Sequence, residues 1–241
     1  DLIMIKKKLK LDFYTQHGAI LELQPIQPRS KPPTWWKSIK NSYDTYRSRV
    51  GTKIPTPTLK TCPGVVDYIR KPITLKLWSD AIFKVKPDGD VECIEPHYGA
   101  DIISGAMHER KQFGDTLYPN RTIFKLHGPW TVTANRRAEF MITEVHFSED
   151  LRKHNILLVP GITNFYDQHT LNVFLVFPIK AEEYTVTLKY GTPIMSIYPM
   201  HEQELDIKMH KCSPHDFQEF QNVFPSTFIG RYHSGKHARN K

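Results

Sequence analysis

The sequence predicts an all-β protein whose body is an antiparallel β-sandwich or jelly roll, with an N-terminal arm and a short C-terminal helix. Between residues 72 and 200, apolar residues occur in short, often alternating runs separated by Pro, Gly, Asn and Asp. Pro87-Asp88-Gly89-Asp90 separates two of these runs, as the turn of a β-hairpin does. Most runs follow one another without a helix-length crossover, so we expect neighbouring strands to be antiparallel.

The strands of the body follow from these runs. Ile73–Trp78 alternates apolar and polar residues, and Ala81–Lys86 and Val91–Ile94 flank the Pro-Asp-Gly turn. Trp78 and Trp130 lie within apolar runs, so we predict that they fill the core and do not form an exposed carbohydrate-binding platform. The remaining predicted strands are Arg121–Thr133, Glu139–Phe147, Ile156–Val159, Leu171–Ile179, Tyr184–Tyr190 and Pro193–Tyr198.

Two helices are expected. Pro63–Arg70 can form two turns after Cys62. A longer helix is predicted to begin after Ser213, which can cap it, with Pro214 at the first helical position. Its apolar residues recur at helical spacing, and Pro225 ends it.

The composition is that of a globular protein with a sizeable core: 241 residues, 39% of them hydrophobic, and a net charge of +8. No run approaches the roughly 18 consecutive apolar residues of a membrane-spanning helix. The N-terminus does not have the form of a signal peptide, so we expect no secretion by that route. The cysteines are odd in number and scattered, which does not indicate a disulfide framework: Cys62, Cys93 and Cys212.

Positive charge is concentrated in three segments. Residues 1–10 carry +3, residues 29–60 carry +7 and residues 231–241 carry +4, which leaves −6 on the rest of the chain. We therefore expect residues 1–60 to form a basic strand and arm packed on the body, 61–200 the β-sandwich body, and 201–241 a helix and basic tail. The residues predicted to dock on a polyanion or partner are Lys6, Lys7, Lys8, Lys10, Arg47, Arg49, Arg231, Lys236 and Arg239.

Basic extensions have more than one interpretation. They can bind nucleic acid or the acidic face of a protein subunit, or they can be solvated segments that keep the protein soluble. In residues 29–60, aromatic residues such as Trp35 and Trp36 alternate with the basic ones. Such aromatics can stack on single-stranded nucleic acid, but more often they fasten an extended arm to its own domain.

Several short motifs follow one another along the chain: Thr61–Asp67, Leu77–Asp80, Pro96–Gly99, His127–Val132 and Tyr190–Pro199. Their order resembles a family of uncharacterised proteins from bacteria and from tailed phages of marine cyanobacteria, over roughly residues 31–200. The family has no established activity, so the resemblance implies a context: a phage-encoded protein located in the host cytoplasm or in a virion. It also implies a cupin-like or sandwich body in which Gly191–Pro199 forms a late core strand.

A cupin-like body raises an alternative function, a non-haem iron oxygenase, which needs two His and one carboxylate on one face. The sequence lacks the usual His-x-Asp or His-x-Glu spacing. His97 with Asp101 and His108 with Glu109 are the nearest approximations, and His127 or His146 could supply a further ligand. The simpler interpretation is that His97 forms hydrogen bonds within its loop.

Other enzyme signatures are weak or absent from the sequence. His210, Cys212 and His215 form a tight cluster, but a structural zinc site needs four ligands, and a polar turn capped by Ser213 explains the same residues. The sequence contains no Gly-x-Ser-x-Gly elbow, phosphate-binding loop or dinucleotide-binding motif.

The sequence therefore favours a non-catalytic structural or accessory protein without a cofactor. We expect it to dock through basic extensions on other protein subunits, in a homo-oligomer or virion, with nucleic acid as a further possible partner and no membrane association. The alternative is the oxygenase, with iron as its cofactor.

Overall fold

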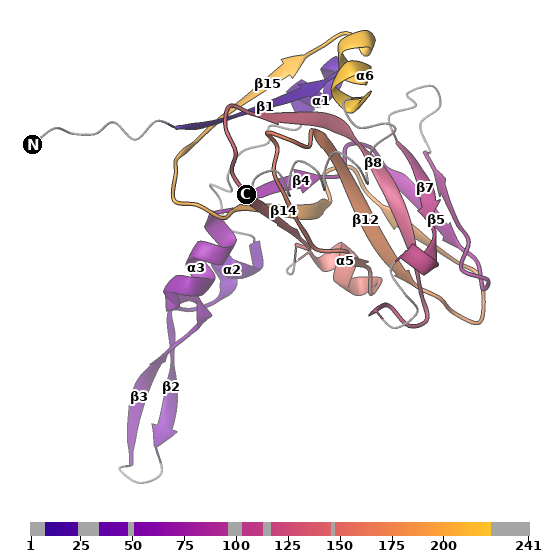
Figure 1. The fold of residues 1–241 in the computed structure, drawn as a ribbon. Coiled ribbons are helices and arrows are strands. Elements are labelled where there is room, and N and C mark those ends of the chain that lie inside the picture. Colours follow the sequence, from indigo (N-terminus) through magenta and orange to yellow (C-terminus); the bar gives the residue numbers. More distant parts are fainter. Residues whose placement is uncertain are drawn as a thin grey trace, which may run out of the picture.

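The computed structural model describes residues 8–23, 34–47, 51–95, 103–112, 117–145 and 148–222. These residues form four β-sheets and a few short helices, so the predicted all-β class is confirmed. Most neighbouring strands are antiparallel, also as predicted. Figure 1 shows a layered body from which one hairpin extends.

The largest sheet is organised around the long strand β8. One edge of β8 pairs with β12, which in turn pairs with β10, and its other edge pairs with β1 and β7; β15 continues the sheet beyond β1. The strands of this sheet are β1 (Leu9–Thr15), β7 (Ser104–His108), β8 (Arg121–Ala134), β10 (Leu157–Leu158), β12 (Thr170–Pro178) and β15 (Leu205–Lys211).

Two smaller sheets complete the body. One has the order β11-β9-β14-β4, and the other has the order β13-β5-β6. Their strands are β4 (Ile73–Lys76), β5 (Ala81–Val85), β6 (Val91–Ile94), β9 (Phe140–Thr143), β11 (Gly161–Thr163), β13 (Tyr184–Leu188) and β14 (Pro193–Pro199).

The core is continuous between the sheets. Phe83 of β5 contacts Phe124 of β8 and Phe177 of β12, with ring centroids 5.7 and 5.1 Å apart. Trp78 and Trp130 are both buried, which confirms their predicted place in the core. Burial of such large apolar surfaces is the main force that holds the layers together.

Segments from the two ends of the described chain meet in the largest sheet. In β1 the alternate residues Leu9, Leu11 and Phe13 are fully buried, and the Phe13 ring packs edge-on against Trp130. β15 pairs with β1 in parallel register from Leu205 to Lys211. Leu9–Thr15 and Leu205–Lys211 therefore belong to the same sheet as β8.

Most predicted elements are found, and the differences have local causes. α3 (Pro63–Arg70) has the predicted bounds. β9 is shorter than its predicted strand because the chain turns near Val145, whose carbonyl accepts a hydrogen bond from Ser148 N. β10 has only two residues, and Pro160, which lacks an N–H, follows shortly after it.

The C-terminal helix α6 (Pro214–Asn222) begins as predicted. Ser213 Oγ accepts a hydrogen bond from Asp216 N and donates one to the Asp216 carboxylate. The predicted end of this helix at Pro225 lies outside the described residues. The other short α-helices are α1 (Gly18–Leu23), α2 (Thr34–Ser38) and α5 (Glu149–Lys153).

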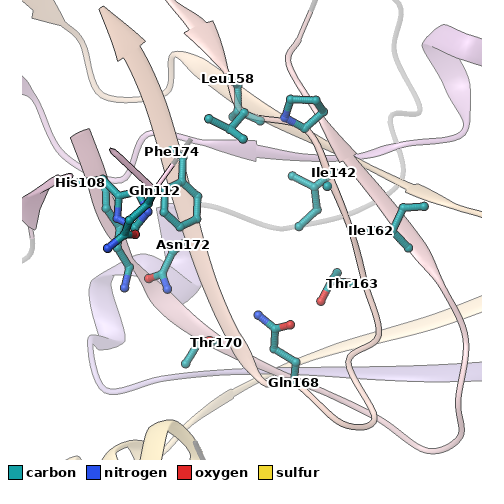
Figure 2. A pocket seen from close by; sticks show the side chains of 14 residues that line it. His108, Gln112, Ile142, Leu158, Ile162, Thr163, Gln168, Thr170, Asn172 and Phe174 are labelled. Carbon is teal, nitrogen blue, oxygen red and sulfur yellow. The ribbon is translucent and has the colours of Figure 1, made fainter. Parts of the chain in front are cut away.

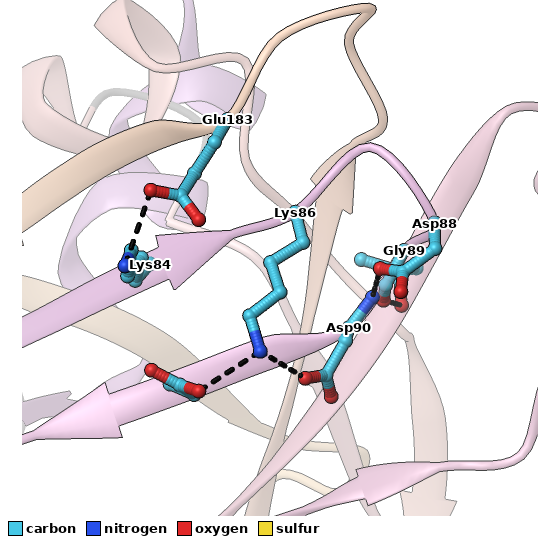
Figure 3. A network of polar contacts seen from close by, with 8 residues as sticks. Lys84, Lys86, Asp88, Gly89, Asp90 and Glu183 are labelled. Atoms are coloured by element: carbon cyan, nitrogen blue, oxygen red, sulfur yellow. Dashed lines mark hydrogen bonds and ion pairs between the residues drawn. The ribbon is translucent and has the colours of Figure 1, made fainter.

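The predicted turn between β5 and β6 is confirmed. Lys86 N donates to Asp90 O, Gly89 N donates to Lys86 O, and Gly89 has φ +90°. Lys86 Nζ lies 2.9 Å from the carboxylates of Asp90 and Glu92, an arrangement visible in Figure 3. These ion pairs are exposed, so the glycine geometry and the backbone bonds are the more important features of the turn.

A second hairpin was not predicted. β2 (Ser42–Arg47) and β3 (Thr52–Pro57) pair only with each other. In Figure 1 this hairpin extends away from the body beyond α2 and α3. Its location within the basic segment 29–60 makes it relevant to function.

We predict that Gly89→Ala lowers the free energy of unfolding by about 1–2 kcal/mol, because a Cβ is strained at positive φ. The added Cβ would also lie 3.1 Å from Ile179 Cδ1. Urea denaturation measures the loss. Gly64→Ala is the control, since its Cβ meets no atom within 4 Å and it should leave stability unchanged or raised; equal stability of the two variants would contradict the prediction.

Candidate functional site

A pocket of about 610 Å³ lies between the largest sheet on one side and strands β9 and β11 on the other. Its volume is in the range of ligand-binding pockets. Figure 2 shows His108, Gln112, Asn172 and Phe174 on one side and Ile142, Leu158 and Ile162 on the other. Thr163, Gln168 and Thr170 lie together at one end of the pocket.

Strand alternation explains which side chains reach this pocket. In β8, Phe124 and Leu126 are buried, while Lys125 and His127 point to the opposite face. Phe174 is directly opposite Lys125 in the register of β12, so both lie on that outer face. The same strand thus supplies the core with one set of residues and the pocket with the other.

The edge strand β7 adds further polar groups to this face. Ser104 is paired with His127, and His108, four residues later, lies on the same face. Ser104 Oγ is 3.4 Å from His127 Nδ1. The His108 ring packs edge-on against Phe174, with centroids 5.1 Å apart.

Burial and the nearby Lys125 both disfavour protonation of the two histidines. Burial, and then the positive charge of Lys125, lower the pKa of His108 and of His127 below the ordinary value. Both imidazoles are therefore neutral at pH 7. Among the described residues of the pocket lining, Lys125 is the lysine, and neither Asp nor Glu is present.

The residues of the alternative oxygenase site are only partly described. His97, Asp101 and His146 lie outside the described residues. His127 lies on the outer face of β8, next to Ser104. Within the described ranges, one group of three potential metal ligands is close enough to hold an ion, and it consists of the exposed His215, Asp216 and Glu219.

In the structure, His210 and His215 have different partners. His210 Nε2 lies 2.7 Å from Asp12 Oδ1, and its ring stacks on Tyr14. His215 lies instead beside the carboxylates of α6. Since Ser213 forms the expected cap, the interpretation as a polar turn accounts for the cluster.

The cysteines are free thiols. Burial, with a smaller effect of Glu95, raises the pKa of Cys93 to about 12. Burial and then Asp216 raise the pKa of Cys212. Both thiols are protonated at pH 7, which makes them poor nucleophiles.

The predicted docking residues are also only partly described. Lys8 Nζ forms a 2.6 Å ion pair with Glu204, and the backbone N–H of Lys10 donates to Asn135. Arg47 is in β2 of the projecting hairpin. The predicted residues outside the described ranges are Lys6, Lys7, Arg49, Arg231, Lys236 and Arg239.

The pocket was not identified from the sequence. Its residues come from six strands and the loops between them, and they share no short motif. One signal was present: Lys125 and His127 are polar residues two positions apart within an otherwise apolar run. In a strand that is buried on one face, such a pair marks a second face with its own role.

No protein-family model and no curated protein matches the chain. Across the described residues, no helix has both the length and the apolar character needed to cross a bilayer.

We predict that Lys125→Met raises the pKa of both His108 and His127, since it removes the positive charge that disfavours their protonation. NMR titration of the histidine side chains measures both values. His154 is the internal control, because its pKa is lowered by burial and other lysines, Lys153 and Lys180. A uniform shift of all three histidines, or no shift of His108 and His127, would refute this account.

Proposed function

We propose that the protein is a non-catalytic structural or accessory subunit that docks on acidic surfaces of protein partners through its basic extensions. The observation that carries this proposal is the projecting hairpin β2–β3, which lies in the most basic segment of the chain. The rest of the chain offers the opposite charge, because the residues outside the three basic segments carry a net charge of −6. A second copy of the chain is thus one available partner.

The hairpin presents side chains suited to recognition. Lys40 at its base and Lys53 in β3 are exposed, and Tyr43 is 57% exposed. Tyrosine is enriched in interfaces because it combines a large contact surface with a polar group, and exposed lysines attract acidic surfaces at long range. The hairpin therefore offers both apolar area and positive charge to a partner.

Prolines protect the β3 edge of the hairpin from unwanted pairing. Pro55 and Pro57 lie in β3 and lack the N–H that an added strand would need. Docking through backbone hydrogen bonds along this edge is therefore disfavoured. Recognition is expected to depend on the side chains, whose charge makes it sensitive to salt.

The base of the hairpin is fastened to neighbouring segments. Thr58 N donates to Asn41 O, and Lys60 Nζ donates to the carbonyl of Ile39. Trp36 is only 6% exposed and packs edge-on against Trp35. This burial favours the interpretation in which the aromatics fasten the arm to the protein over the one in which they stack on nucleic acid.

The proposal also includes the type of fold, the source of the protein and its location. The body is a jelly roll of cupin-like type, and the protein is phage-encoded and acts in the host cytoplasm or in a virion. These assignments are supported by the order of motifs shared with the phage and bacterial family over residues 31–200, a range that includes the hairpin.

We predict that replacing Tyr43–Thr56 by Asn-Gly leaves the body folded, because Ser42 and Pro57 are already paired at the base. The shortened protein should leave a heparin column at lower salt than the wild type, and any oligomer that depends on the hairpin should dissociate in sedimentation experiments.

The matched control is Lys76→Gln with Lys208→Gln, which removes the same net charge of +2 from exposed positions of the body. If the salt concentration at which this control leaves the heparin column falls as much as it does for the shortened protein, net charge alone explains binding. The hairpin then has no specific role, and the proposal fails.

The oxygenase remains the second candidate, and one observation favours it: His127 is kept neutral, the form in which imidazole binds metals. We predict that the purified protein contains no stoichiometric iron or zinc. Elemental analysis of the wild type and of His127→Ala decides between the two functions. Near-stoichiometric metal that is lost in His127→Ala would replace the docking proposal with the oxygenase that uses His97, Asp101, His127 and His146.

A further inference from the structure

We propose that the pocket beside β8 binds a small organic acid in its anionic form, an apolar body that carries one negative charge and places it against Lys125. This inference concerns a small ligand and goes beyond the docking function of the hairpin. It rests on the charge of the pocket and the arrangement of its apolar surface.

The charge of the pocket is unbalanced. Lys125 lies on the pocket face of β8, and among the residues that the structure describes the lining contains no acidic side chain that could neutralise it. Among the ion pairs of the described residues, Lys125 has no partner. A half-buried ammonium without a counterion is costly, and an anion in the pocket relieves that cost.

The number of charges indicates a monoanion. Among its described residues, the lining has one lysine and no arginine, so Lys125 supplies a single positive charge. The imidazole of His108 lies on the same face and can donate a hydrogen bond to an oxyanion.

The opposite wall suits an apolar body. Ile142 and Leu158 face Phe174 across the pocket in Figure 2. Ile162 is 57% exposed, although it lies in a β-strand next to this apolar surface. A ligand with an apolar portion would cover this surface, and the amides of Gln168 and Asn172 could orient its polar end.

Two dyes of nearly equal shape test the inference. 8-Anilinonaphthalene-1-sulfonate has an apolar aromatic body and one anionic group, while N-phenyl-1-naphthylamine has the same body without the charge. We expect fluorescence titration at pH 8 to show one site for the anionic dye and weaker binding of the neutral dye.

Lys125→Met should weaken binding of the anionic dye about tenfold, the effect of losing a charge-assisted contact, and leave binding of the neutral dye unchanged. Lys208→Met is the matched control, since Lys208 is an exposed lysine on β15 of the same sheet, outside the pocket lining. It should bind both dyes as the wild type does.

A second pair of variants tests the proposal even if Lys125→Met fails to fold. Ile162→Asp places a negative charge at the pocket, and Ile162→Asn is its neutral counterpart of similar size. Because Ile162 is exposed, both should fold. We expect the Asp variant to bind the anionic dye more weakly than the Asn variant, and both to bind the neutral dye equally.

The results that overturn the proposal are equally specific. They are absence of a saturable site for the anionic dye, equal effects of Lys125→Met and Lys208→Met, or equal binding of the anionic dye by the two Ile162 variants. The protein with the shortened hairpin should bind both dyes as the wild type does, so failure of the docking function leaves this test intact.

Discussion

The two-sided pairing of β8 is the constraint on which the rest of the structure depends. Its 14 residues pair with β12 along one edge and with β1 and β7 along the other. Because side chains alternate, this strand contributes Phe124 and Leu126 to the core and Lys125 and His127 to the outer face. A register slip by one residue would bury the cation and expose the aromatic ring, so core packing fixes the position of Lys125.

The elements with strong local signals could be predicted from the sequence. The turn at Gly89 combines proline, aspartate and a glycine at positive φ between two alternating runs, and each of these acts over a few residues. The cap at Ser213 and the proline that follows it are equally local. Such features appear in the structure because the chemistry that specifies them is contained in the segment itself.

The remaining elements depend on partners far away in the sequence. β15 lies beside β1 in parallel register, a pairing between segments almost 200 residues apart that neither segment specifies alone. β7, Ser-Gly-Ala-Met-His, has no apolar alternation and forms against the edge of β8, where Gly105 lets its backbone lie close to the Phe124 ring. The pocket is harder still to predict, because it combines one polar face of β8 with residues of β7, β9, β10, β11 and β12.

The hairpin and the pocket are connected through one small sheet. α3 follows the hairpin in the chain and leads to β4, which pairs with β14; β14 pairs with β9, and β9 pairs with the pocket strand β11. Tyr198 of β14 also donates a hydrogen bond to the carbonyl of Tyr68 in α3 and stacks on its ring. Coupling between two sites requires an element with two alternative arrangements, whereas each ladder on this path shows one set of pairs, with a β-bulge between Pro193 and Met195. We therefore infer that the two sites act independently: a ligand in the pocket acts on its own surroundings and leaves the hairpin free to dock.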